Sequence, residues 1–314
     1  MSHTPIRYSQ NFLRDPRLVE RLLEASSVGH DDLVIEIGPG AGIITDGLAQ
    51  RARQVVAVEL DATLAERLRC RYAATPQVVI HTGDFLEHAL PERPYKVFAS
   101  IPFACTHEIV TRLTSAACPP QDAYLIMQRE AAEKFCGDQR EYLYSALLKP
   151  WFTLEITHHF RRSDFMPAPS VEVVMLRIHK RGPPLIVARE RQQYRDFVVY
   201  GFTARQPSIE QTLRSVLSHR QCRQALRLCE IAPDATPSSI SFPQWLQLYR
   251  QVARVGGVQV WQAIGGGEAR LRRQQRHLSK RHRTRARGAG ESSVQGHSSA
   301  VVGMAKSAYA WEWR

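Results

Sequence analysis

The stretch that decides the fold is LVIEIGPGAGIITDGLAQ, residues 33–50. An apolar run, Leu33–Ile37, enters a glycine-rich turn, and a helical pattern follows over residues 43–51. Glycines in a strand-to-helix turn let the backbone approach a ligand closely. The spacing G-x-G-x-G differs from the G-x-G-x-x-G of dinucleotide binders, which disfavours a nicotinamide dehydrogenase. The stretch therefore predicts a loop for a cofactor without a pyrophosphate, with a tight turn that holds no ligand as the alternative.

Strand-like apolar runs and helical patterns alternate on both sides of this loop. The further runs are Gln54–Glu59, Val78–His81, Lys96–Ser100 and Ala123–Gln128. Helical stretches are expected at 15–27, 61–73 and 106–116. Such alternation predicts an open α/β fold with a parallel sheet. Two later runs, Thr153–Phe160 and Val171–His179, are expected to pair as an antiparallel edge.

Length and composition predict more than one domain. The chain has 314 residues, of which 44% are apolar and 23% charged, as in ordinary globular proteins. Gly182-Pro183-Pro184 marks a boundary, after which helical periodicity appears at 189–203, 207–218, 220–229 and 242–254. We expect an N-terminal arm (1–14), a Rossmann-like α/β domain (15–180), a small all-helical domain (181–260) and a disordered basic tail (261–314).

Several classes of protein are disfavoured by what the sequence lacks. No stretch approaches the roughly 18 consecutive apolar residues of a membrane helix, and the first residues lack the apolar core of a signal peptide. The six cysteines form no C-x-x-C pair and have no histidine at zinc spacing. We therefore expect a cytoplasmic protein, a monomer, with reduced thiols, no metal and no membrane partner.

The positive charge is concentrated in the second half of the chain. The net charge is +12 overall, but −3 over residues 1–179 and +7 over 180–260. Residues 270–287 carry nine basic and no acidic side chains. The regional excess points to a polyanion such as RNA, although each arginine alone could be a solvated surface residue. The candidate contacts are Arg161, Arg162, Arg189, Arg191, Arg195, Arg220, Arg223 and Arg227.

Acidic residues follow the second and third strands. Glu59 ends one run, where a carboxylate can accept hydrogen bonds from two ribose hydroxyls. Asp84 follows the next run and could accept from an adenine amine, with Phe85 packing on the ring. Each acid alone is more often a helix cap or a solvated charge. With the glycine loop, they predict a site for S-adenosylmethionine.

The fourth strand ends in Ser100-Ile101-Pro102-Phe103. One interpretation is a strand-terminating proline with an aromatic plug. The other is the tetrapeptide of amino-group methyltransferases. There, a side-chain oxygen and a main-chain carbonyl accept hydrogen bonds from an exocyclic adenine amine and aim its lone pair at the methyl group. The aromatic residue stacks on the extruded base.

Together these motifs resemble the rRNA adenine N6-methyltransferases, which include the erythromycin-resistance (Erm) enzymes of 23S rRNA and the 16S rRNA dimethyladenosine enzymes. The resemblance covers residues 8–255 and includes QNFL (10–13), EIGPGAG (36–42), GDF (83–85), SIPF (100–103), MQREAA (127–132) and PAPSVE (167–172). It implies a cofactor site of Gln10, Asn11, Leu13, Gly38, Gly40, Glu59, Leu60, Asp84, Phe85 and Ser100. It also implies a catalytic turn of Ser100, Ile101, Pro102 and Phe103, with Phe165 as a second stacking face.

Within this family, the isoleucine of SIPF and the arginine-rich late sequence resemble the 23S enzymes, which block macrolide, lincosamide and streptogramin B binding. The alternatives are a 16S enzyme acting in small-subunit assembly, a DNA adenine methyltransferase and a catalytically weak RNA-binding relative. Ser100 replaces the asparagine usual in the family. Because its hydroxyl has a shorter reach, we expect the second methyl transfer to be slow.

Overall fold

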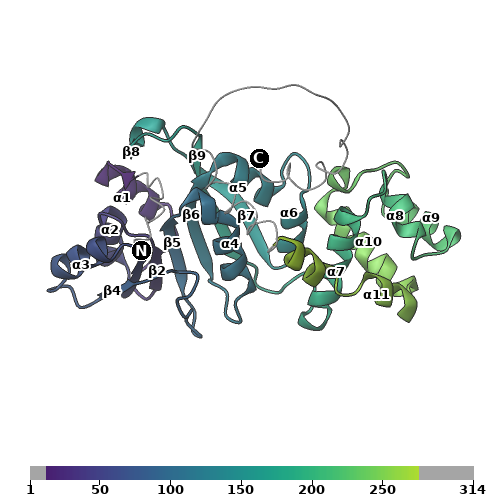
Figure 1. Cartoon of the computed structure of the whole chain (residues 1–314), viewed down its shortest axis with the longest axis horizontal. Coiled ribbons are helices and arrows are strands. Elements are labelled where there is room, and N and C mark those ends of the chain that lie inside the picture. The colour runs from purple at the N-terminus through teal and green to yellow at the C-terminus, as the bar shows by residue number, and fades with distance from the viewer. Residues whose placement is uncertain (1–11, 276–314) are drawn as a thin grey trace, which may run out of the picture.

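A seven-stranded mixed sheet forms the centre of the computed structural model, which describes residues 12–275 (Figure 1). The strand order is β4-β3-β2-β5-β6-β9-β7. The first five are parallel neighbours, whereas β9 runs antiparallel to both β6 and β7. The strands are β2 (Leu33–Ile37), β3 (Gln54–Glu59), β4 (Val78–Thr82), β5 (Lys96–Ser100), β6 (Asp122–Gln128), β7 (Phe152–His159) and β9 (Val173–Lys180). The predicted Rossmann-like fold and antiparallel edge are confirmed.

Helices cover both faces of this sheet. Residues of α1 (Pro16–Glu24), α2 (Ile43–Arg51) and α3 (Ala62–Arg71) share one apolar cluster with the strands. Residues of α4 (Thr106–Ser115) and α5 (Arg129–Cys136) share a second cluster with the opposite face. Because both faces are covered, the central strands are mostly apolar and buried, and all five residues of β2 are buried.

The end of the N-terminal arm differs from the expectation. Phe12–Leu13 form a short strand, β1, which pairs antiparallel with β8 (Phe165–Met166). The prediction of an irregular arm is therefore wrong for these two residues, because Leu13 is buried in the core. The predicted cofactor residues Gln10 and Asn11 lie outside the described residues.

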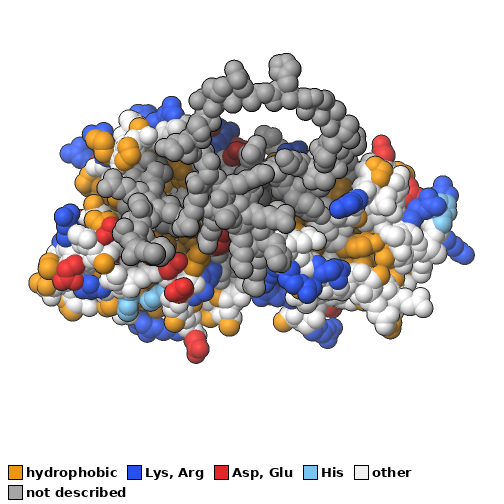
Figure 2. Space-filling view, in the orientation of Figure 1, with side chains coloured by type: hydrophobic (Ala, Val, Ile, Leu, Met, Phe, Trp, Pro, Cys, Tyr) orange, Lys and Arg blue, Asp and Glu red, His pale blue; other side chains and the backbone are white. Residues whose placement is uncertain are grey.

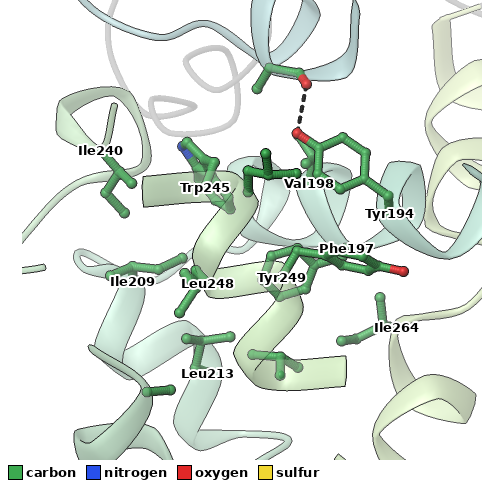
Figure 3. Packing of buried hydrophobic residues seen from close by; sticks show 14 of the residues in the cluster. Tyr194, Phe197, Val198, Ile209, Leu213, Ile240, Trp245, Leu248, Tyr249 and Ile264 are labelled. Atoms are coloured by element: carbon green, nitrogen blue, oxygen red, sulfur yellow. Dashed lines mark hydrogen bonds between the residues drawn. The ribbon is translucent and has the colours of Figure 1, made fainter. Parts of the chain in front are cut away.

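A helical part follows the sheet and has its own core (Figure 3). It contains α7 (Arg191–Thr203), α8 (Ile209–Arg214), α9 (His219–Leu228), α10 (Phe242–Val255) and α11 (Val258–Ile264). Trp245, Tyr194 and Tyr249 are fully buried there. The same cluster includes Leu143 and Leu147 of α6 (Leu143–Leu148), which belongs to the sheet part. The Tyr194 hydroxyl also donates to the Ala146 carbonyl of α6 (2.8 Å, Figure 3).

The basic tail begins later than expected. Residues 258–264 form α11 and residues 267–275 form another helix. The prediction of disorder from 261 is therefore wrong for 261–275, because Leu271 is buried and Asp196 accepts hydrogen bonds from the backbone N–H groups of Gly266 and Glu268. The rest of the predicted tail, 276–314, lies outside the described residues.

Candidate active site

Four predicted site segments meet along one edge of the sheet. Strands β4, β3, β2 and β5 are adjacent and parallel, so their carboxyl ends lie side by side. In the register, Ile37 lies between Val58 and Ala99, and Glu59 lies opposite Thr82. This edge is where ligands bind in open α/β sheets.

The glycine loop lies between β2 and α2. Gly40 has φ +58°, and a Cβ atom there would lie 2.4 Å from the Phe12 ring, so only glycine fits under that ring. Gly38 has φ +68°, and its Cβ position lies 3.7 Å from the Ser100 carbonyl oxygen. The loop therefore lies beside the predicted catalytic turn. Phe12 is a site residue that the sequence analysis did not single out.

Glu59 connects the glycine loop with the start of α3. Its side chain is 1% exposed. The Gly40 N–H donates to Oε2 and the Asp61 N–H donates to Oε1, each at 3.0 Å. The carboxylate is therefore held in place at the end of β3, and its contact with a ribose stays a prediction.

The residues after β4 lie at the same edge, and two of them differ in exposure. Asp84 is exposed, and its Oδ1 accepts from the Leu86 N–H (2.8 Å). Phe85 is 5% exposed and lies in a core cluster, with the Arg112 guanidinium 5.9 Å from its ring centre. The Phe85 ring thus packs in the core, and its contact with adenine stays a prediction. Leu60, beside Glu59, is 54% exposed.

The catalytic turn continues directly from β5. Ser100 ends the strand, and the Ile101 N–H donates to the Ile126 carbonyl (3.1 Å), which fixes the turn to β6. Pro102 is extended, with φ −61° and ψ 128°, and Phe103 opens a short 3₁₀ turn before α4. The half-buried Phe103 packs against the cluster that contains Leu13 and Phe165. Phe165 itself is 3% exposed, and its ring lies 5.3 Å from that of Phe160.

The predicted RNA-binding arginines fall into two groups. Arg161, Arg162 and Arg223 are exposed, as a contact with RNA requires. Arg195 is wrong as a candidate, because it is buried and its Nε and Nη2 donate to the Glu268 carboxylate at 2.8 and 2.7 Å. The sequence showed only an arginine in a basic helix, since its partner lies 73 residues later.

Two side chains at the end of α3, those of Arg71 and Tyr72, hold the far end of the glycine loop, and we call this pair the brace. The Arg71 guanidinium donates to the Ala41 carbonyl (2.9 Å) and also binds Asp46. The Tyr72 hydroxyl lies 2.6 Å from Asp46 Oδ1 and 3.1 Å from the Gly42 carbonyl oxygen. Burial and the Asp46 carboxylate raise the pKa of Tyr72, so its hydroxyl stays a donor. No sequence motif pointed to this pair.

This combination of sheet, glycine loop and acids at successive strand ends defines the Rossmann-like methyltransferases that use S-adenosylmethionine. The model of one family, ribosomal RNA adenine dimethylase, matches residues 1–254. The chain belongs to that family. It is an rRNA adenine N6-methyltransferase, and S-adenosylmethionine is its cofactor.

Relatives within this family carry names such as rRNA adenine N-6-methyltransferase and ribosomal RNA small subunit methyltransferase A. An rRNA adenine N-6-methyltransferase of Saccharopolyspora erythraea is 30% identical over 78% of this chain and 65% of its own length, just under two thirds. A ribosomal RNA small subunit methyltransferase A of Synechococcus is 31% identical over 77% of this chain and 90% of its own. The crystal structure of the 23S rRNA methyltransferase ErmE has a TM-score of 0.72 and 30% identity. The match covers 77% of this chain and 100% of that one.

The described residues also bear on metals, thiols and membranes. Between residues 12 and 275, no group of three His, Cys, Asp or Glu side chains could hold a metal ion. All six cysteines are free thiols, and Cys136, Cys222 and Cys229 are buried. In the same part of the chain, no helix is long and apolar enough to cross a membrane.

Glu36, the acid of β2 beneath the loop, predicts an unusual pH dependence of stability. Burial raises the pKa of its carboxyl to about 8, although the Thr45 hydroxyl donates to it (2.7 Å). The folded chain thus keeps a proton that the unfolded chain loses near pH 4.5, so stability falls as the pH rises from about 4.5 to 8. Glu36→Gln keeps an acceptor for Thr45 and removes this titration. In urea unfolding, we expect the free energy of unfolding of the variant to exceed that of the parent by a few kcal/mol at pH 9 and to match it at pH 5. Equal stabilities at pH 9 would contradict this.

The brace predicts a moderate loss of cofactor affinity. Tyr72→Phe removes one hydrogen bond to the loop, which is worth about 0.5–1.5 kcal/mol. We expect S-adenosylhomocysteine to bind roughly 2–10-fold more weakly in calorimetry, with kcat at saturating cofactor unchanged. Arg69→Gln is the matched control, because Arg69 also lies on α3 but binds Glu66 and Thr82 instead of the loop. A lower kcat with unchanged affinity would exclude a positioning role.

Proposed function

We propose that this enzyme methylates N6 of an adenine in the peptidyl-transferase loop of 23S rRNA and so gives resistance to macrolides, lincosamides and streptogramin B. The observation that supports it best is the similarity to the 23S rRNA methyltransferase ErmE over the whole length of that structure. The proposal places the protein in the cytoplasm, acting as a monomer on free rRNA or on an assembling subunit.

The site residues then have defined roles. S-adenosylmethionine supplies an electrophilic methyl group. In the proposal, Glu59 holds its ribose and Asp84 its adenine amine, while Gly38 and Gly40 allow close approach of the loop. The buried Glu59 carboxylate at the end of β3 fits such a ligand, whereas the Phe12 ring fills the space where a Cβ atom of residue 40 would lie.

The catalytic turn acts on the target base. The Ser100 hydroxyl and the Ile101 carbonyl accept hydrogen bonds from the adenine N6 amine, and Phe103 stacks on the base. These contacts turn the nitrogen lone pair toward the methyl group, and the nitrogen loses its proton after alkylation. Catalysis by this turn is therefore mainly positioning and needs no strong base.

In the proposal, exposed arginines of α9 bind the phosphate backbone of the RNA. Arg220, Arg223 and Arg227 recur at helical spacing, opposite the buried Cys222 and Leu226. Figure 2 shows basic side chains gathered at this end of the molecule, around α8 and α9. Arg161 and Arg162 are exposed and precede Phe165 by a few residues, so in the proposal they bind RNA near the second stacking face.

The second candidate is a 16S rRNA adenine dimethyltransferase of small-subunit assembly. The Synechococcus relative named ribosomal RNA small subunit methyltransferase A favours it, because its 31% identity to this chain equals that of one relative named rRNA adenine N-6-methyltransferase. Transfer of labelled methyl to protein-free 23S rRNA, protein-free 16S rRNA, 30S subunits and duplex DNA separates the two, with nuclease digestion and mass spectrometry of the fragments to map the base. A methylated adenine in the peptidyl-transferase loop supports the proposal. Transfer to 30S subunits alone replaces it with the 16S activity, and transfer to DNA alone contradicts both.

Ser100 predicts a product ratio. Since serine reaches less far than asparagine, the monomethylated amine is held less well and the second transfer is slow. We expect mass spectrometry at early times to show mainly monomethyladenosine for the parent and mainly dimethyladenosine for Ser100→Asn. Ser100→Ala, with no acceptor, is expected to lose most activity. Mainly dimethyl product from the parent at early times would contradict the hypothesis.

A further inference from the structure

The short ribbon of β1 and β8 joins segments on either side of the strand that carries the catalytic turn. The Phe12 ring of β1 lies against Gly40, in the loop that follows β2. Strand β8 belongs to the segment 160–172, which connects β7 with β9. This segment enters β9 at the catalytic edge, because Val173 pairs with Gln128, the last residue of β6. Since β5 lies between β2 and β9 in the strand order, the ribbon belongs to the surroundings of the target base.

Helix α1 follows the ribbon directly and carries two arginines on one exposed stripe. The Arg14 N–H donates to the Asp164 carbonyl (3.0 Å), which continues the pairing of β1 with β8 up to the helix. Arg17 and Arg21 are exposed and lie one turn apart, opposite the buried apolar side of α1. Burial and the nearby charge of Arg21 lower the pKa of His158 in β7. The arginine stripe therefore lies toward the end of β7 and the segment that follows it.

The acidic side chains near this stripe do not neutralise it. Glu20 and Glu24 form a separate stripe of α1, and Glu24 pairs with an arginine of α2 (3.5 Å). Asp15 caps α1 by accepting from a backbone N–H (2.9 Å). Asp164 caps the turn before β8 by accepting from the Arg161 N–H (2.7 Å). The carboxylates thus serve backbone groups or a different cation.

Exposed arginines from α1 and from the segment 160–172 surround the ribbon. We call this surface the α1 face, and its members are Arg14, Arg17, Arg21, Arg161 and Arg162. Between residues 12 and 275, none of the five forms an ion pair with a carboxylate. Figure 2 shows basic side chains gathered at the upper left, where Figure 1 places α1 and β8. Such an excess of unpaired positive charge fits a polyanionic partner.

The apolar residues of the α1 face favour RNA over a membrane. A helix that lies on a membrane needs a broad exposed apolar face. The apolar side of α1 is instead buried in the core, and Met166 of β8 is the large apolar side chain exposed beside these arginines. Arginines around one apolar side chain can bind phosphates while that side chain packs on a sugar or a base.

We propose that the α1 face binds phosphates of the RNA strand on one side of the target adenine, while α9 binds the RNA on the other side. Figure 1 places α1 and α9 at opposite ends of the molecule, with β5 between them. This inference rests on the proposed function and adds to it a contact from α1, which no sequence motif indicated. Arg17 and Arg21 are its central residues.

The experiment measures methyl transfer by the full-length chain to protein-free 23S rRNA, with saturating S-adenosylmethionine and at several salt concentrations. For Arg17→Gln/Arg21→Gln we expect KM for RNA to rise at least about fivefold, kcat to stay the same, and the slope of log affinity against log salt to lose about 1.5 units. Arg17→Lys/Arg21→Lys keeps both charges and is expected to keep the slope. Arg53→Gln/Arg67→Gln removes two exposed cations elsewhere in the sheet part and is expected to match the parent.

Hydroxyl-radical footprinting locates the contact on the RNA. The Gln variant of the α1 face is expected to lose protection on one side of the target adenine only, and a melting curve confirms that it is folded. Unchanged KM and salt slope in this variant, or an equal loss in the control, overturn the proposal. Weaker binding to vesicles of anionic lipid with an unchanged KM for RNA also overturns it, in favour of a membrane contact. If the parent methylates another rRNA but not 23S rRNA, the proposed function fails, and the same comparison on that rRNA tests the α1 face separately.

Discussion

Replacing Glu59 with alanine is expected to weaken S-adenosylhomocysteine binding about 100–1,000-fold. The carboxylate is buried and accepts two backbone N–H bonds, and in the proposed complex it also accepts from the ribose hydroxyls. Hydrogen bonds to a charged group are worth about 1.5–3 kcal/mol each, and every 1.4 kcal/mol is a factor of ten. Two such bonds at the lower end of this range, about 3–4 kcal/mol together, account for the expected 100–1,000-fold loss.

Calorimetry measures this affinity directly. Glu66→Ala is the matched control, because Glu66 is an exposed carboxylate on the adjacent helix that pairs only with Arg69 among the described residues. Glu59→Gln keeps an acceptor, and its affinity for S-adenosylhomocysteine is expected to lie between those of Glu59→Ala and Glu66→Ala. A dissociation constant for Glu59→Ala within threefold of the parent would remove Glu59 from the cofactor site.

Phe103→Ala is expected to lower kcat/KM for RNA about 5–150-fold and to leave S-adenosylhomocysteine affinity unchanged. Stacking of a base on an aromatic ring is worth about 1–3 kcal/mol. The half-buried Phe103 is the last residue of the turn that, in the proposed complex, holds the amine. Single-turnover methyl transfer with saturating cofactor measures the loss.

Two further variants separate stacking from packing. Phe103→Tyr keeps an aromatic face and is expected to restore most of the activity. Leu185→Ala removes an exposed apolar side chain elsewhere and serves as the control. If Phe103→Tyr were as inactive as Phe103→Ala while both bound cofactor normally, stacking would not be the function of this side chain.

The sheet could be predicted from the sequence because its strands are buried on both faces. The ranges expected for Leu33–Ile37, Gln54–Glu59 and Lys96–Ser100 agree with the observed strands. The glycine loop and the acids at strand ends followed from the same alternation, since parallel strands bring their carboxyl ends to one edge. Membership of the methyltransferase family confirmed the fold and the cofactor, while the roles of the loop glycines and of the individual acids stay predictions.

Features that depend on distant partners could not be predicted in this way. Arg195 looked like its exposed neighbours until the structure placed Glu268 against it. The helix at 267–275 follows a run of three glycines and is mostly polar, and it is stabilised by Asp196 rather than by its own pattern. The Arg71 and Tyr72 side chains contact loop carbonyls some 30 residues earlier, a relationship without a local motif.

The core shared by α6 and the helical part has a consequence for which RNA can be a substrate. Because Leu143, Leu147 and the Tyr194–Ala146 hydrogen bond join the two parts, the catalytic turn and the α9 arginines are held at a fixed separation. In the proposed complex this fixed separation selects the RNA by its shape. An adenine is accepted only when the RNA folds so that its phosphates match that gap, which lets tertiary shape, rather than base sequence alone, select the nucleotide.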